Sequence, residues 1–145
     1  MAGNASPIYS RIGAISLNGA ATLGTTIVSD YNGTGANNAL VFTADATNGG
    51  FIQRLRFKAL GTNTTAAVAR IYFNNGTGAN TTAANNTFFG EISLPSTTAS
   101  TTTATVDIDY PINIALPPGY KIYVGISSSA VLGAGWAVTT IAGAY

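Results

Sequence analysis

The sequence contains no cysteine and no histidine. Without cysteine it can form neither disulfides nor thiolate metal sites, and without histidine it lacks the commonest general base and metal ligand of proteins. Charged residues are also scarce, at 8% of the chain, against roughly 25% in an average soluble domain. Six cations and five anions leave a net charge of +1, which gives no basic surface for nucleic acid or an anionic membrane. We therefore expect a surface solvated mainly by Thr, Asn, Ser and Gly.

Long apolar runs are missing as well. No stretch approaches the ~18 to 20 consecutive apolar residues that a membrane-spanning helix needs. The first thirteen residues have neither the basic leading segment nor the apolar stretch of a signal peptide. The 145 residues are instead typical of a single domain that can bury a hydrophobic core.

Short stretches rich in β-branched and aromatic residues alternate along the chain with clusters of Gly, Asn, Thr and Pro. No stretch of ten or more residues shows the 3.6-residue apolar period of a helix. Strands with one apolar face must pack sheet on sheet, so the sequence predicts an all-β fold, an antiparallel β-sandwich of jelly-roll type. The expected strands are 8–17, 22–28, 40–44, 51–60, 66–73, 88–94, 103–116, 120–127 and 136–141.

Alternation within these strands predicts the core. In 51–60, Phe51, Leu55, Phe57 and Ala59 are expected on the apolar face, opposite a row of cations. Pro111 interrupts 103–116 and has no N–H to donate, so we expect an edge position or a bend there. The side chains expected to be buried are Leu55, Phe57, Ile71, Phe73, Ile92, Val106, Ile108, Ile122, Val124 and Ile126.

Four Asn-Gly pairs, starting at Asn18, Asn32, Asn48 and Asn75, lie between the expected strands. Asn-Gly supplies the positive φ that tight turns need. The hexapeptide Asn-Gly-Thr-Gly-Ala-Asn occurs twice, starting at Asn32 and at Asn75. Because the flanking sequences differ, we interpret it as shared loop chemistry and not as a structural repeat.

Asp107 and Asp109 are the most plausible catalytic pair. They are two residues apart on an expected strand, so both carboxylates lie on one face, ~7 Å apart. However, catalytic carboxylates normally come from different elements around a cleft, and the neighbouring Thr-rich sequence indicates a solvated strand face. Ser and Thr have no histidine to activate them, and Lys121 lies in a regular strand. We expect no enzymatic activity, no catalytic residue, no cofactor and no metal site.

Arg54, Arg56 and Lys58 place half of the six cations in one row on one strand face. Two interpretations stay open. The row is either a solvated face with cross-strand partners such as Asp107 and Asp109, or an anchor that faces an acidic patch on another protein.

The order of several segments carries a family resemblance that covers roughly residues 38 to 145. These segments are FIQRLRFKALGTNTTA at 51–66, VARIYFNNG at 68–76, EISL at 91–94, INIALPPGYKIYVG at 112–125, and WAV and AGAY in the last ten residues. In this order they resemble a family of small proteins encoded in the structural-gene clusters of tailed phages and prophages. Some relatives of that family resemble jelly-roll capsid decoration (cement) proteins.

The resemblance implies a non-enzymatic virion protein, made in the host cytoplasm, that binds the outer surface of the capsid and stabilises the shell. The implied partners are the major capsid protein and further copies of the same chain in a homotrimer, with no nucleic acid and no membrane. The alternative is a phage head-fibre or tail module that recognises a host-surface glycan. That alternative predicts exposed aromatic platforms, for instance at Tyr31, Tyr72 or Tyr145.

Residues 1–17 are expected to form an N-terminal arm or the first strand, and 18–145 a single β-sandwich domain. The first residues lack the pattern needed to bury themselves in their own domain. The arm hypothesis orders them on another chain, with Ile8 and Tyr9 as the apolar anchor and Arg11 as the polar one. The expected capsid or subunit contacts are therefore Ile8, Tyr9, Arg11, Arg54, Arg56 and Lys58.

Overall fold

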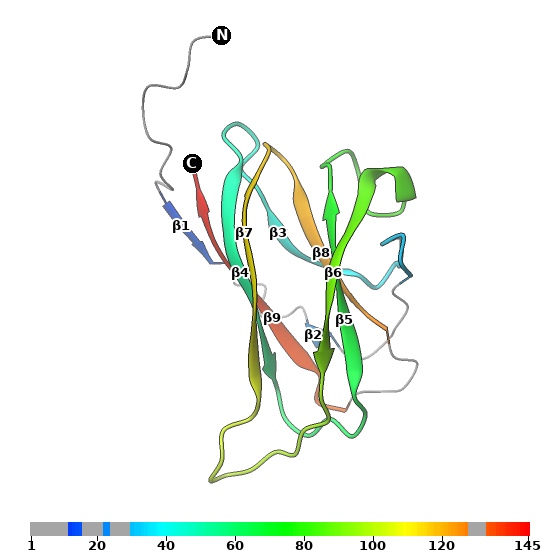
Figure 1. Cartoon of the computed structure of the whole chain (residues 1–145), viewed down its shortest axis with the longest axis vertical. Helices are drawn as coiled ribbons and strands as arrows, with labels where there is room; N and C mark the ends of the chain where they lie inside the picture. The colour runs from blue at the N-terminus through cyan, green and yellow to red at the C-terminus, as the bar shows by residue number, and fades with distance from the viewer. Residues whose placement is uncertain (1–11, 16–21, 24–29, 128–132) are drawn as a thin grey trace.

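The computed structural model describes residues 12–15, 22–23, 30–127 and 133–145 (Figure 1). In these residues the chain forms nine strands and one short 3₁₀ turn, so the predicted all-β fold is confirmed. The elements are β1 (Ile12–Ile15), β2 (Thr22–Leu23), β3 (Ala39–Thr43), β4 (Gly50–Ala59), β5 (Ala67–Asn74), η1 (Ala83–Asn85), β6 (Asn86–Leu94), β7 (Asp107–Leu116), β8 (Lys121–Ile126) and β9 (Trp136–Ala144).

The strands form two antiparallel sheets that face each other as a β-sandwich. The first sheet has the order β1-β9-β4-β7, with β2 also paired to β9, and the second has the order β3-β8-β5-β6. The strand pairs are nested along the chain. The innermost pair is β5 with β6, and outside it follow β4 with β7, β3 with β8 and β1 with β9. β1 and the C-terminal strand β9 therefore lie side by side (Figure 1).

The core lies between the sheets and largely follows the predicted alternation. Phe73, Ile92 and Ile108 are only half-buried but pack against it. Val106 was predicted wrongly, because it is 41% exposed. It lies one residue before β7 begins. The predicted core residues that are buried are Leu55, Phe57, Ile71, Ile122, Val124 and Ile126.

A β-bulge in β4 overturns the predicted position of Phe51. The pairing of β4 with β9 shifts register between Ile52 and Arg54. The extra residue places Ile52 and Leu55, three residues apart, on the same face. Ile52 is fully buried and Phe51 is only half-buried. Beyond the bulge, the alternation from Leu55 to Ala59 is as predicted.

β7 is an edge strand, as Pro111 predicted. Next to it, Asn113 has a positive φ of 51°, and the pairing with β4 shifts register in the same stretch. A proline and an irregularity of this kind are common ways to prevent an edge strand from pairing with another chain. The edge of β7 is thus poorly suited to adding a further strand.

The Asn-Gly pairs form turns with positive φ at the glycine wherever the structure describes them. Gly33, Gly49 and Gly76 have φ values of 71°, 78° and 82°. The pair at Asn18 lies outside the described residues. These turns confirm the predicted loop chemistry.

Candidate interaction surfaces

The cation row on β4 lies beside two carboxylates on β7. Arg56 binds Asp107 through its Nη2 atom, and its Nε lies 3.6 Å from Oδ1 of Asp109. The Nε of Arg54 lies 3.6 Å from Oδ2 of Asp109, which is an ion pair but too long for a hydrogen bond. The cross-strand partners of the first interpretation are therefore present. We call Arg54, Arg56, Lys58, Asp107 and Asp109 the charge ladder.

The charge ladder is exposed and almost neutral. Its paired side chains are 36% to 46% exposed, and exposed ion pairs typically contribute only about 0 to 1 kcal/mol. Lys58 Nζ donates to the backbone oxygen of Thr105 at 2.6 Å. Three cations and two carboxylates leave one positive charge, so the ladder can offer directional hydrogen bonds but little long-range attraction.

Asp107 and Asp109, the pair considered as catalytic carboxylates, are engaged in ion pairs in this structure. Both are bound by arginines on an open strand face, and neither lies in the apolar pocket that a general acid needs. Among the described residues, no three metal-ligating side chains gather into one cluster. In the same residues, no helix has the length and apolar character to cross a membrane.

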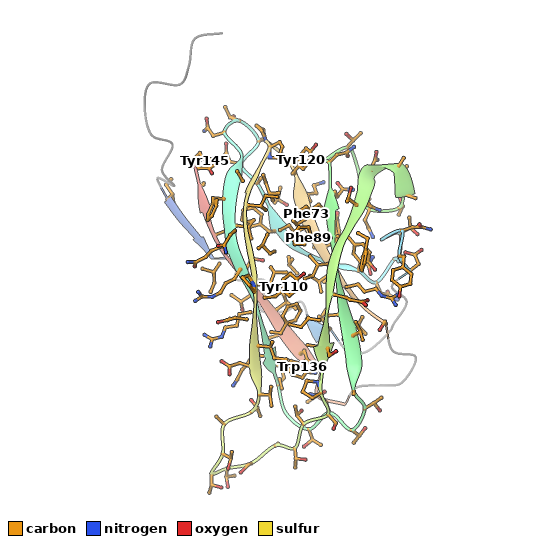
Figure 2. All side chains as sticks on the ribbon, viewed as in Figure 1. Phe73, Phe89, Tyr110, Tyr120, Trp136 and Tyr145 are labelled. Atoms are coloured by element: carbon orange, nitrogen blue, oxygen red, sulfur yellow. The ribbon has the colours of Figure 1, made fainter. Side chains whose placement is uncertain are left out.

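The side of the sandwich between β6 and β7 is closed by aromatic contacts. Phe73 stacks on Phe89 with ring centroids 4.3 Å apart, and Phe89 meets Tyr110 edge-on at 6.5 Å (Figure 2). The Tyr110 hydroxyl lies over Gly90, where an added Cβ would be 2.2 Å from its oxygen. The glycine thus lets the two edge strands approach each other.

This side also exposes apolar surface. Phe89 and Ile114 are 38% and 37% exposed, and Tyr110 and Ile112 are half-buried. Exposed apolar groups next to edge strands are typical of surfaces that contact other proteins. We call Phe89, Tyr110, Ile112 and Ile114 the open flank.

Replacing Gly90 by Ala is expected to lower the free energy of unfolding by about 1 to 3 kcal/mol, because the new methyl group collides with Tyr110. In a Tyr110→Phe background the nearest ring atom is 3.3 Å from the methyl group, so the same change should cost clearly less. Urea unfolding of the four proteins measures the coupling, expected to exceed about 0.5 kcal/mol. Gly13→Ala is the control, since a Cβ there meets nothing within 4 Å. Strictly additive effects of the two substitutions would contradict the contact.

A second surface lies on the outer face of the β3-β8-β5-β6 sheet, which the segment 30–38 partly covers (Figure 1). Tyr72 is fully buried beneath this segment, and its hydroxyl donates to the backbone oxygen of Asp30. A Cβ at Gly33 would be 2.8 Å from the Tyr72 ring. Tyr72 was therefore predicted wrongly as an exposed platform. Tyr31 is 60% exposed, as predicted, and Tyr145 is half-buried.

The two copies of the hexapeptide come together at this surface. Asn80, the last residue of the second copy, donates through Nδ2 to the backbone oxygens of Gly33 and Gly35 in the first, at 2.9 and 3.0 Å. Asn38 also donates to the Gly33 oxygen at 2.9 Å. Buried side-chain amides thus donate to backbone oxygens of the 30–38 segment up to Asn38, which pairs with no strand among the described residues.

The other candidate features are less specific. The predicted contacts Ile8, Tyr9 and Arg11 lie outside the described residues. A shallow depression on the second sheet is lined by 66–68, 93–95 and Ser127, and this lining contains no titratable side chain. No protein-family model, curated protein or solved structure was found to match the chain.

Proposed function

We propose that this protein is a non-enzymatic structural protein of a tailed-phage virion, a decoration (cement) protein that binds the outside of the capsid. The observation that carries the proposal is the open flank, where exposed apolar side chains accompany two edge strands on a rigid sandwich. The resemblance of the segment order to phage structural proteins supports it. A module that binds only the assembled shell stabilises that shell by mass action.

The nested strand pairing supports the jelly-roll assignment. Setting β2 aside, the eight remaining strands form two four-stranded sheets, as if one long hairpin had been folded over on itself. Jelly rolls have eight strands in two sheets and occur among viral capsid proteins. We include this fold type in the proposal.

The proposed partners are the major capsid protein and, in a homotrimer, further copies of this chain. The open flank provides apolar contact area, and Arg54, Arg56 and Lys58 provide hydrogen-bond donors on the neighbouring strand β4. Three-fold symmetry would multiply weak contacts by avidity. Because the charge ladder keeps one uncompensated charge, we expect shell binding to depend only weakly on salt.

Cosedimentation with empty shells, assembled from the major capsid protein of the same gene cluster, tests this proposal. We expect saturable binding that weakens by less than about threefold between 50 and 500 mM salt. Ile114→Asp in the open flank should weaken it by about tenfold or more. Leu60→Asp, at a residue that is 49% exposed beyond the end of β4, is the control. Absence of binding at saturating protein would defeat the proposal.

A glycan-binding role is the second candidate function, and one observation favours it. Tyr31 is the most exposed aromatic side chain among the described residues. The two functions are compatible, because the charge ladder lies on the first sheet, whereas Tyr31 packs against Arg70 and Phe88 of the second.

A further inference from the structure

The aromatic ring of Tyr31 stands in a defined cluster on the outer face of the second sheet. Its ring meets Phe88 edge-on, with centroids 5.3 Å apart and an interplanar angle of 87°. The guanidinium carbon of Arg70 lies 4.0 Å from the centroid of the Tyr31 ring. Arg70 is in turn paired with Glu91, whose Oε2 is 3.4 Å from its Nε. We call Tyr31, Phe88 and Arg70 the Tyr31 platform.

The backbone on both sides of Tyr31 is held in place. Before it, the Asp30 carboxylate accepts hydrogen bonds from Thr34 N at 3.1 Å and Thr34 Oγ1 at 2.7 Å. The Thr34 hydroxyl is the main reason that the pKa of Asp30 is lowered, and backbone N–H groups add to the effect. After it, the backbone oxygen of Asn32 accepts from Asn86 Nδ2 at 3.1 Å. The ring is thus presented by a preorganised loop, which reduces the entropy lost on binding.

The loop that carries Tyr31 is held by further hydrogen bonds besides the one from the Tyr72 hydroxyl. Asn80 reaches from the second hexapeptide to bond two carbonyls of the first, and Asn86 bonds the backbone oxygen of Asn80 as well as that of Asn32. These bonds order the turn around Gly33 and with it the adjacent Tyr31. Yet 60% of the Tyr31 surface remains in solvent. A ring that is ordered and yet exposed is what a binding platform needs.

The chemistry around the ring favours a neutral sugar. The face of an aromatic ring carries negative charge density that attracts the weakly positive C–H groups on one side of a pyranose. Arg70 covers one face of Tyr31, so the pyranose would stack on the opposite face. The exposed Glu91 carboxylate is paired with Arg70, which lies against the ring, and carboxylate groups bind sugar hydroxyls. Arg70 is balanced by Glu91, so the platform has no excess positive charge to select phosphates.

We propose that the Tyr31 platform is a saccharide-binding site that takes one pyranose ring of a cell-surface glycan. The stacked ring supplies the affinity, and the Glu91 carboxylate, which Arg70 holds next to the platform, orients the hydroxyls. The site lies on the sheet opposite to the charge ladder, so a copy that uses its ladder on a shell presents Tyr31 on the other face. This inference rests on the glycan-binding role named above as the second candidate function, and it does not depend on shell binding.

Saturation-transfer NMR on the intact protein tests the proposal. The probes are methyl α-D-glucopyranoside, methyl α-D-mannopyranoside, methyl β-D-galactopyranoside and N-acetylglucosamine, each at millimolar concentration. We expect transfer to the C–H protons on one ring face of at least one probe. Tyr31→Ala should raise its Kd by about tenfold or more, whereas Tyr31→Phe should stay within about threefold. Tyr145→Ala, the same residue type at the half-buried C-terminus, should leave the Kd unchanged.

Two outcomes would overturn the assignment. One is the absence of transfer to every probe, and the other is a Kd that Tyr31→Ala does not change. If Tyr31→Ala weakens cosedimentation with shells while no sugar binds, the platform is a protein contact instead. Sugar binding by a protein that fails to bind shells would defeat the decoration proposal and leave this inference standing.

Discussion

Replacing Leu55 by Ala is expected to lower the free energy of unfolding by about 3 to 5 kcal/mol. Leu55 is fully buried in the middle of β4, between β7 and β9, and belongs to the core shared by both sheets. Truncation removes its transfer free energy and leaves a cavity that two hydrogen-bonded neighbouring strands cannot collapse to fill. At about 2 to 4 °C per kcal/mol for a domain of this size, the melting temperature should fall by roughly 10 °C. Urea unfolding and calorimetry measure both quantities.

Leu60→Ala is the matched control for this prediction. It removes the same atoms one residue beyond the end of β4, where the side chain is 49% exposed. The expected cost is within about 0.5 kcal/mol, as for other surface substitutions. Similar losses from both variants would mean that the described packing between the sheets is wrong.

Asn63→Ala is expected to cost about 3 to 5 kcal/mol, although Asn63 is polar and lies in a loop. Its side chain is fully buried. It joins three loops at one end of the sandwich, and these loops are the three connections considered below. Asn63 Nδ2 donates to Thr97 Oγ1 at 3.0 Å and to the Gly135 oxygen at 3.2 Å, and Asn63 Oδ1 accepts from Gly135 N at 2.7 Å. Truncation leaves the buried Gly135 N–H without its partner, whereas the Gly135 oxygen keeps the hydrogen bond from Leu60 N at 3.1 Å. The desolvation penalty of that N–H adds to the loss of the other bonds of the amide.

Two further variants separate this network from a general effect of removing an asparagine. Thr97→Val keeps the shape but removes the hydroxyl, which also donates to the Gly61 oxygen at 2.7 Å, so about 1 to 2 kcal/mol should be lost. Asn37→Ala, at an exposed turn residue, should change the free energy of unfolding by less than about 0.5 kcal/mol. If Asn63→Ala unfolds in urea like the unsubstituted protein, the three connections are not held together as described.

Much of the sandwich was predictable because apolar alternation has a direct physical cause. Leu55 and Phe57 could be assigned to the core since each faces the same side of a regular strand. Phe51 could not, because a one-residue bulge reverses the alternation, and an apolar Ile52 beside an apolar Phe51 gives no sign of where it occurs. Val106 failed for a different reason: it continues the apolar alternation of β7 but lies just outside the strand, where its side chain is exposed.

The candidate surfaces were less predictable, since they depend on contacts between distant segments. Tyr31 and Tyr72 are equivalent as candidates in the sequence, and only the packing of 30–38 over β5 buries one and leaves the other exposed. The charge ladder was foreseen as one of two alternatives, but the register that places Arg56 opposite Asp109 required the structure. The two copies of the hexapeptide contact each other through Asn80. The sequence alone indicated only shared loop chemistry, because the flanking sequences differ.

A cryo-electron microscopy reconstruction of empty shells incubated with saturating protein tests the decoration proposal most directly. We expect one β-sandwich per binding site on the outer surface, arranged in trimers. The open flank and the charge ladder should face protein, and Tyr31 should face solvent. Shells that remain bare under these conditions, or sandwiches found only on tails or fibres, would contradict it.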